Sequence, residues 1–97
     1  MDAYAGQVYL LKAENGLYKI GFSRKLDERM HAIKKAIPMK LELVYHHYRR
    51  FGQEAELELH RFFTNKRVQG EWFTLDDEDV QYFKDYFTSE VIDATQL

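Results

Sequence analysis

The sequence has no cysteine, a single proline and no long apolar run. Without cysteine, the chain cannot form disulfides, thiolate metal sites or a cysteine nucleophile, and redox chemistry does not fix its compartment. No apolar segment approaches the roughly 20 residues that a membrane helix needs. Residues 1–6 have neither the basic segment nor the apolar core of a signal peptide. We therefore expect a cytoplasmic protein with no membrane contact.

Apolar residues make up 45% of the chain and aromatic residues 15%, which is ample for one modest core. We expect a single domain over residues 1–97, with its core at about residues 6–88 and a frayed acidic tail at residues 89–97. Residues 1–70 carry 13 Lys or Arg against 8 Asp or Glu, whereas residues 71–97 carry 1 against 8. This basic body permits a polyanionic partner such as nucleic acid without requiring one, because surface charges more often serve solvation.

Two segments near the start of the chain, residues 7–11 and 17–22, alternate apolar with polar or aromatic residues as strands do. They are joined by Ala13-Glu14-Asn15-Gly16, in which Asn15-Gly16 supplies the positive-φ residues of a tight hairpin turn. Residues 40–48 are rich in strand formers and can pair with this hairpin as a third strand.

Apolar residues at helical spacing predict a first helix at about residues 24–36, which Pro38 ends. A second helix is predicted at about residues 53–64. A third begins near Asp76, where four acidic residues suit the positive end of its dipole. Between the last two helices, residues 68–74 are expected to form a compact aromatic segment. The predicted fold is α+β, with a small three-stranded, mainly antiparallel sheet flanked by about three helices.

Three polar side chains in these helices have both a structural and a chemical explanation. Arg29 lies beside the apolar stripe of the first helix, where it either pairs locally or grips a phosphate. Glu56 and His60 are four residues apart on one helix face, either as an ordinary helical pair or with Glu56 as a ligand of Mg²⁺. The neighbours His46 and His47 point to opposite faces of their strand, so they cannot chelate one metal together and are assigned a structural role.

The order of these parts resembles the GIY-YIG nuclease superfamily over residues 6 to about 75, and most closely its small single-domain branch of phage and bacterial type. Five short motifs carry the resemblance, and each is weak alone. They are Val8-Tyr9-Leu10-Leu11, Tyr18-Lys19-Ile20-Gly21, Leu26-Asp27-Glu28-Arg29, Glu56-Leu57-Glu58-Leu59-His60 and Gly70-Glu71-Trp72-Phe73. Five such motifs in the family's order make chance a poor explanation.

The resemblance implies a metal-dependent endonuclease that hydrolyses the phosphodiester bonds of a nucleic acid, DNA more than RNA. By position, it makes Tyr9 the first-motif tyrosine, Arg29 the catalytic arginine and Glu56 the ligand of Mg²⁺ or Mn²⁺. His60 would relay a proton, position water or orient Glu56. Because the pKa of free tyrosine is about 10, Tyr9 needs a nearby cation to act as a base, and Lys19 or Arg29 would supply it.

The chain departs from the family pattern in the first two motifs. Gln7 replaces the first-motif glycine, and Lys19 rather than Tyr18 falls where the second-motif tyrosine is expected. Neighbouring strand residues face opposite sides, so either Lys19 faces the site as a phosphate-binding cation or Tyr18 reaches it through a local irregularity. We favour Lys19, because Tyr18, Ile20 and Phe22 form an apolar face. Phe22 also stands where some family members have a catalytic lysine.

Several cations are predicted to contact the nucleic-acid backbone, namely Lys19, Arg24, Lys25, Arg29, Lys34 and Lys35. So little of the chain lies outside the core that base readout would need a homodimer or an accessory targeting protein. Two other interpretations stay open at this point. The domain either binds nucleic acid without turnover, or uses its aromatic surface to bind another protein.

Overall fold

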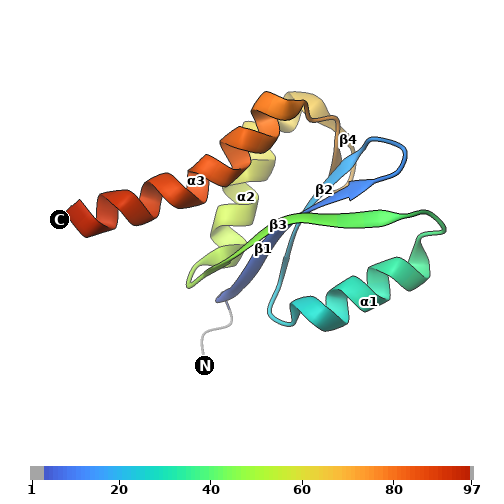
Figure 1. Cartoon of the computed structure of the whole chain (residues 1–97), viewed down its shortest axis with the longest axis horizontal. Coiled ribbons are helices and arrows are strands. Elements are labelled where there is room, and N and C mark those ends of the chain that lie inside the picture. Colours follow the sequence, from blue (N-terminus) through green and yellow to red (C-terminus); the bar gives the residue numbers. More distant parts are fainter. Residues whose placement is uncertain (1–3, 97) are drawn as a thin grey trace.

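The computed structural model of the chain describes residues 4–96, with side chains described for residues 4–88. Within this range there are five strands, three α-helices and one 3-10 turn (Figure 1). The strands are β1 (Gly6–Ala13), β2 (Tyr18–Ser23), β3 (Leu41–Arg49), β4 (Arg67–Gln69) and β5 (Trp72–Phe73). The helices are α1 (Leu26–Ala36), α2 (Gly52–Phe62) and α3 (Asp77–Gln96), and the 3-10 turn η1 is Thr64–Lys66. The strands pair antiparallel in the order β3-β1-β2-β5-β4.

The α+β class and the three helices agree with the prediction, but the predicted three-stranded sheet is wrong. Within residues 4–96 the sheet has five strands. The additional strands, β4 and β5, form a small hairpin in the segment that we expected to be a compact aromatic connection. Gly70, with a φ of 57°, lies in its turn. Strands of three and two residues are too short to show alternation, and β5 is held by its pairing with β2.

The turn between β1 and β2 also differs from the expected tight turn. Gly16 has a φ of 89°, but no non-glycine residue in the described range has a positive φ, so Asn15 does not adopt the predicted conformation. The Asn15 side-chain oxygen instead accepts a hydrogen bond from the Leu17 N–H (3.0 Å), and the Gly16 N–H donates to the Ala13 carbonyl (2.9 Å). The result is a longer loop that ends in a left-handed glycine, a common hairpin connection.

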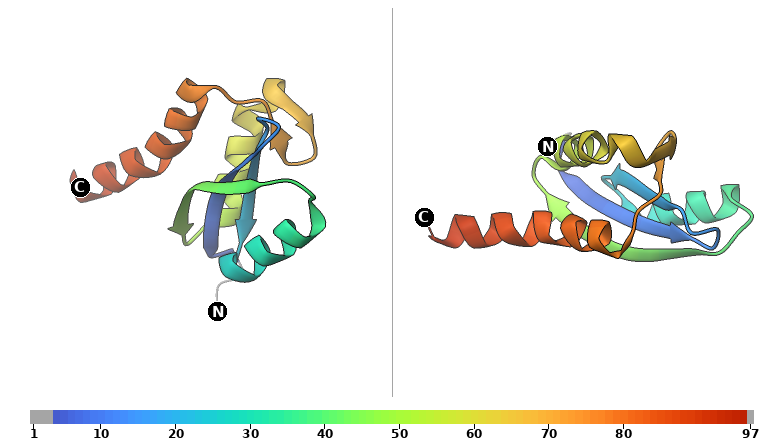
Figure 2. Two further views of the ribbon diagram at one scale, coloured as in Figure 1. Left: turned by 45° about the vertical axis from the view of Figure 1, so that its right-hand side comes forward. Right: turned by 90° about the horizontal axis from the view of Figure 1, so that it is seen from above.

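The two faces of the sheet pack against different helices (Figures 1 and 2). One set of alternate residues, which includes Val8, Leu10 and Ile20, packs against α2 and α3. The other set, which includes Tyr9 and Leu11, packs against α1. Successive residues of a strand point to opposite faces, so β1 contributes to both layers. Side chains from both layers also meet at one edge of β2.

The helix boundaries lie close to the predicted ones. The Ser23 hydroxyl accepts a hydrogen bond from the Lys25 N–H (3.0 Å) just before α1 begins, and Pro38 follows its end. Where we expected a frayed tail after Ser89, the backbone of α3 continues as a helix to Gln96. The side chains of residues 89–96, and residue 97, lie outside the described part of the structure. A helix able to span a membrane is not found among the described residues.

Candidate active site

Tyr9 lies across Gly21 on the α1 face of the sheet. The two residues are register partners, and a Cβ atom added to Gly21 would lie 2.3 Å from the Tyr9 hydroxyl oxygen. The glycine therefore provides the space that the tyrosine ring occupies. The ring is fully buried, and within the described residues its hydroxyl has no hydrogen-bond partner of standard geometry. A buried hydroxyl of this kind is expected to bind water or a ligand.

The second half of β2 has an open edge, where side chains from both layers reach its backbone. β5 pairs with the first two residues of β2, and among the described residues no strand continues along this edge. The Ile20 carbonyl instead accepts a hydrogen bond from His60 Nε2 (2.8 Å), and the Phe22 carbonyl accepts one from the Arg29 guanidinium (3.5 Å). α1 and α2 lie on opposite faces of the sheet, yet each delivers a polar side chain to this edge.

Glu56 lies in α2 one turn before His60, and it is only 8% exposed. Its Oε2 atom is 4.0 Å from His60 Nε2, too far for a hydrogen bond. Burial, reinforced by the negative charge of Glu71, raises the pKa of Glu56 to about 7, although the cations Lys19 and Arg29 act in the opposite direction. Near neutral pH, Glu56 therefore exchanges between its carboxylate and carboxylic acid forms.

Five side chains, Tyr9, Lys19, Arg29, Glu56 and Glu71, lie within electrostatic reach of one another and form one cluster at the edge of β2. Glu71 was missed among the site residues predicted from the sequence. Its carboxylate accepts a hydrogen bond from Lys19 Nζ (2.7 Å), and its backbone carbonyl accepts one from the Ile20 N–H (3.1 Å). Glu71 lies in the turn between β4 and β5, so its position depends on a hairpin that the sequence did not predict. Its place within the motif Gly70-Glu71-Trp72-Phe73 was the available signal.

The alternation of β2 separates Tyr18 from Lys19. Tyr18 is buried in the core beneath α2 and α3, whereas Lys19 lies on the other face and pairs with Glu71. The register of β1 with β2 runs continuously through both residues. Lys19 thus faces the cluster, as in the interpretation that we favoured, and no irregularity brings Tyr18 to it. Lys19 already has an anionic partner, so a phosphate would have to compete with Glu71 for it.

The geometry limits two of the roles considered for the site residues. Burial raises the pKa of Tyr9 above its ordinary value of 10.0, and the nearby Arg29 cation offsets this effect only in part. Tyr9 is therefore protonated at neutral pH and suited to orient a water molecule rather than to remove its proton. His60 Nε2 must carry a hydrogen, because its partner, the Ile20 carbonyl, can only accept. That atom is therefore suited to positioning α2 rather than to accepting a proton.

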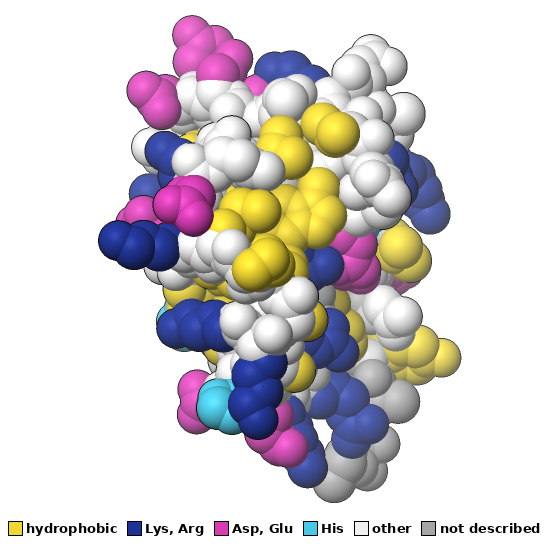
Figure 3. Space-filling view, turned by 90° about the vertical axis from the view of Figure 1, so that its right-hand side faces the viewer, with side chains coloured by type: hydrophobic (Ala, Val, Ile, Leu, Met, Phe, Trp, Pro, Cys, Tyr) yellow, Lys and Arg dark blue, Asp and Glu magenta, His cyan; other side chains and the backbone are white. Residues whose placement is uncertain are grey.

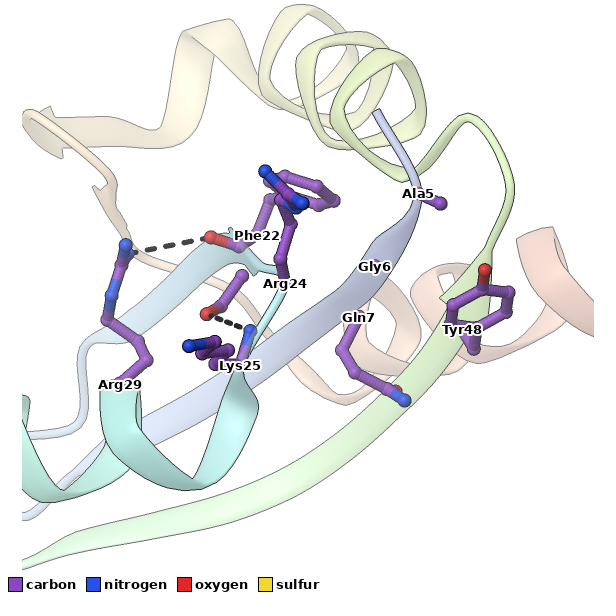
Figure 4. Close-up of a pocket in the computed structure, with 9 residues that line it drawn as sticks. Ala5, Gly6, Gln7, Phe22, Arg24, Lys25, Arg29 and Tyr48 are labelled. Carbon is purple, nitrogen blue, oxygen red and sulfur yellow. Dashed lines mark hydrogen bonds between the residues drawn. The ribbon is translucent and has the colours of Figure 1, made fainter. Parts of the chain in front are cut away.

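Three of the cations predicted to bind nucleic acid lie around one groove. Arg24, Lys25 and Arg29 line this groove, which has a volume of about 890 Å³ (Figure 4). Lys34 and Lys35 are exposed in the last turn of α1 and are not among its lining residues. Figure 3 shows Lys and Arg side chains gathered at the lower end of the molecule, below an apolar patch. The groove thus brings three of the predicted cations together near the end of β2.

The cluster offers oxygen ligands of the kind that a divalent cation prefers. Among the described residues, no group of three His, Asp or Glu side chains is arranged to hold a metal ion. The donors present are the Glu56 carboxylate and, within its electrostatic reach, the Glu71 carboxylate and the Tyr9 hydroxyl. Mg²⁺ typically takes one or two protein carboxylates and completes its shell with water, so this donor set fits the ion. A cation would also stabilise the ionised form of Glu56.

The chain was also compared with known proteins. A family model described as the T5orf172 domain matches residues 6–88. The matched range begins at β1, ends within α3 and contains every residue of the cluster. Comparisons with curated proteins and with solved structures found no match.

Proposed function

The chain belongs to the T5orf172 domain family, and we propose that it is a metal-dependent endonuclease with a site of the GIY-YIG type. T5orf172 domains occur in phage and bacterial nuclease-like proteins. Four side chains from four different elements converge at the open edge of β2, and this convergence is the main support for the proposal. They are Tyr9 of β1, Lys19 of β2, Arg29 of α1 and Glu56 of α2. Such a combination of cations, a hydroxyl and a carboxylate suits the charge that develops during phosphodiester hydrolysis.

The protein groups have separable roles in this reaction. A water oxygen attacks phosphorus while the ester P–O bond breaks, and the proton lost by the water is balanced by protonation of the leaving oxygen. Tyr9 orients the attacking water through its buried hydroxyl. Arg29 donates hydrogen bonds to the non-bridging oxygens and stabilises the charge that develops on them. Lys19 adds a second positive charge when it exchanges Glu71 for the phosphate.

Glu56 would hold Mg²⁺ or Mn²⁺, with Glu71 as a second carboxylate close by. When bound, such an ion polarises a phosphate oxygen and stabilises charge on the leaving oxygen. His60 fixes α2 to the Ile20 carbonyl and thereby holds Glu56 at the edge of β2. Because a carboxyl group must lose its proton to bind a metal, affinity for the metal, and activity when the metal does not saturate the site, should rise with pH up to the region near 7 where metal-free Glu56 ionises.

We propose DNA as the first substrate class to test, with RNA as the second. The basic groove would contact the phosphate backbone of the nucleic acid, and such contacts supply affinity but no sequence information. Sequence specificity would then require a second copy of the chain or a targeting partner. A second candidate function, nucleic-acid binding without turnover, is favoured by one observation: Lys19 stands where the family tyrosine is expected, and it is bound to Glu71.

Cleavage assays with plasmid DNA and labelled DNA and RNA oligonucleotides, in Mg²⁺, Mn²⁺ or EDTA, test the proposal. The unchanged chain should cut in either metal, and Glu56→Gln or Arg29→Ala should lower the rate by about 100-fold or more. Glu54→Gln is the matched control, because Glu54 is an exposed carboxylate in the first turn of the same helix. Circular dichroism should be the same for all variants. Failure of the unchanged chain to cut would reject the enzyme, and salt-sensitive binding would then select the second candidate.

A further inference from the structure

The groove beside Arg29 contains side chains that the proposed hydrolysis does not use. It lies between the first residues of β1, the end of β2, the connection to α1 and the end of β3. Arg24 and Lys25 come from the connection, and Tyr48 comes from β3. In Figure 4, Tyr48 lies across the groove from these cations, with Gln7 between them.

Tyr48 is 59% exposed although it belongs to a strand of the sheet. Its register partner in β1 is Gln7, which also lines the groove. The preceding residue, His47, points to the other face and stacks on Phe87, with ring centroids 5.1 Å apart. The apolar side chains packed beneath α1 include Tyr9, the next residue of β1 on the same face as Gln7, but not Gln7 itself. The Gln7 end of this face is therefore left to the groove. The Tyr48 ring is therefore available to a ligand in the groove.

The other walls of the groove carry hydrogen-bonding and charged groups. The Gln7 amide is held by a hydrogen bond between its Oε1 and His46 Nδ1 (3.1 Å), which leaves its NH₂ group to donate to a base or a phosphate. Lys25 is exposed, and its Nζ lies 3.6 Å from Glu28. A surface pair of this kind is weak, so a phosphate can displace Glu28.

An aromatic ring and cations around one groove are the groups with which proteins bind a single nucleic-acid strand. In a duplex, the faces of the bases are stacked inside the double helix, out of reach of a side chain in the groove. The exposed Tyr48 ring therefore adds affinity only for an unpaired nucleotide. Arg29 belongs both to the groove and to the cluster at the edge of β2, so a strand in the groove leads directly to the proposed hydrolytic site.

We propose that this groove is a subsite for an unpaired nucleotide next to the cleaved phosphodiester, with Tyr48 stacked on the base and Lys25 on the phosphate. The link to cleavage rests on the proposed function, whereas strand binding does not require turnover. The substrate class is then a single strand, or a duplex with an unpaired end. Both DNA and RNA present the same base faces and phosphates to these groups.

Fluorescence anisotropy with labelled oligothymidine, oligouridine and a fully paired duplex tests the subsite, in the Glu56→Gln background to prevent cleavage. Tyr48→Leu should weaken binding of one or both single strands by roughly 5- to 150-fold, which corresponds to about 1–3 kcal/mol of stacking per base. Tyr48→Phe keeps the ring and should bind like the parent. Duplex affinity should not change in either variant. Because Tyr48 is largely exposed, both variants should fold, and thermal unfolding checks this.

Two further variants provide matched controls. Tyr82→Leu removes an exposed ring of α3 outside the groove and should leave strand affinity unchanged. Lys25→Gln should lower the slope of log affinity against log salt by about 0.7, the value for one phosphate of a single strand. Lys40→Gln, which changes an exposed lysine outside the groove, should not. Equal losses on strand and duplex, or no loss, for Tyr48→Leu would overturn the subsite. Strand binding that depends on Tyr48, with no cleavage by the chain that keeps Glu56, would support the subsite and reject the proposed function. Cleavage that Tyr48→Leu leaves unchanged would support the proposed function and reject the subsite.

Discussion

On the face of the sheet that carries α2 and α3, the interior consists of apolar and aromatic side chains in mutual contact. Phe83 and Phe87 are fully buried there, with ring centroids 5.4 Å apart. On the α1 face, Tyr9 is equally buried, but its hydroxyl makes no hydrogen bond of standard geometry within the described part of the chain and adjoins Arg29 and the charged cluster that includes Glu56. The first face gains free energy from burial, whereas the second gives up part of that gain to hold polar groups ready for a ligand. β1 thus contributes apolar contacts to one face and a polar group of the site to the other, while Glu56 and His60 reach the same edge from α2.

The largest effect is expected for Phe83→Ala on the apolar face. Phe83 is fully buried and packs against Phe87 and Tyr45, so its truncation leaves a cavity in the core. The free energy of unfolding, measured by urea denaturation, should fall by about 3–5 kcal/mol. The protein that remains folded should still cleave, because Phe83 lies on the face opposite Tyr9. A loss below about 1 kcal/mol would mean that this face is not the main source of stability.

The next effect concerns the pH dependence of stability that Glu56 introduces at the edge of β2. Its pKa rises from 4.5 to about 7 on folding, so the folded state binds a proton more tightly than the unfolded state. The contribution to stability from protonated Glu56 is full below pH 4.5 and is lost as pH rises through 7, by roughly 3 kcal/mol in total. Glu56→Gln should abolish this loss and be more stable than the unchanged chain at pH 8 in urea titrations without divalent metal.

The exposed carboxylate Glu54 provides the control for that experiment. Glu54→Gln should keep the full decline in unfolding free energy between pH 4.5 and 7 that the unchanged chain shows. If Glu56→Gln retained the same decline, the buried carboxylate would not be its source. The edge of β2 would then hold no poised acid near neutral pH.

A smaller loss is expected for Gly21→Ala, which forces a methyl group against the Tyr9 ring. The added Cβ atom would overlap the Cζ atom and the hydroxyl oxygen of Tyr9, so the ring must move, at a cost of about 1–3 kcal/mol in unfolding free energy. Cleavage should fall together with stability, since the hydroxyl moves with the ring. In a Tyr9→Leu background the same change should cost much less, and a double-mutant cycle by urea denaturation measures the difference. Equal costs in both backgrounds would contradict the close fit of Tyr9 over Gly21.

Local periodicity was enough to predict on which face of a strand or helix several residues of this site lie. The alternation in β1 and β2 placed Tyr9 on one face and Tyr18 on the other, and the helical spacing of Glu56 and His60 placed both on one side of α2. The β4–β5 hairpin could not be predicted, because strands of two and three residues carry no periodic signal. Glu71 was missed for the same reason, since its position depends on that hairpin.

Non-local packing also decides the protonation of the site. The sequence suggested that a neighbouring cation would make Tyr9 a base, and Arg29 does lie near it. The degree of burial could not be read from the chain, and burial dominates, so the pKa of Tyr9 rises rather than falls. His60 similarly donates to the Ile20 carbonyl, which is available because β5 is too short to cover that part of the edge. Both properties arise from contacts between segments that are distant in the sequence, which no local pattern encodes.

The smallest effect on stability is expected for Glu71→Gln, which breaks the ion pair with Lys19 but leaves both cores intact. The Glu71 side chain is 41% exposed, so the pair contributes at most about 1 kcal/mol to the free energy of unfolding. Its charge raises the pKa of Glu56, however, so its removal should shift the pH midpoint of the Glu56-dependent decline to lower pH. Glu28→Gln, which removes an exposed partner of Lys25, should leave the midpoint unchanged. An unchanged midpoint in Glu71→Gln would mean that burial alone poises Glu56, and the contrast between the two faces would then require no contribution from the β4–β5 hairpin.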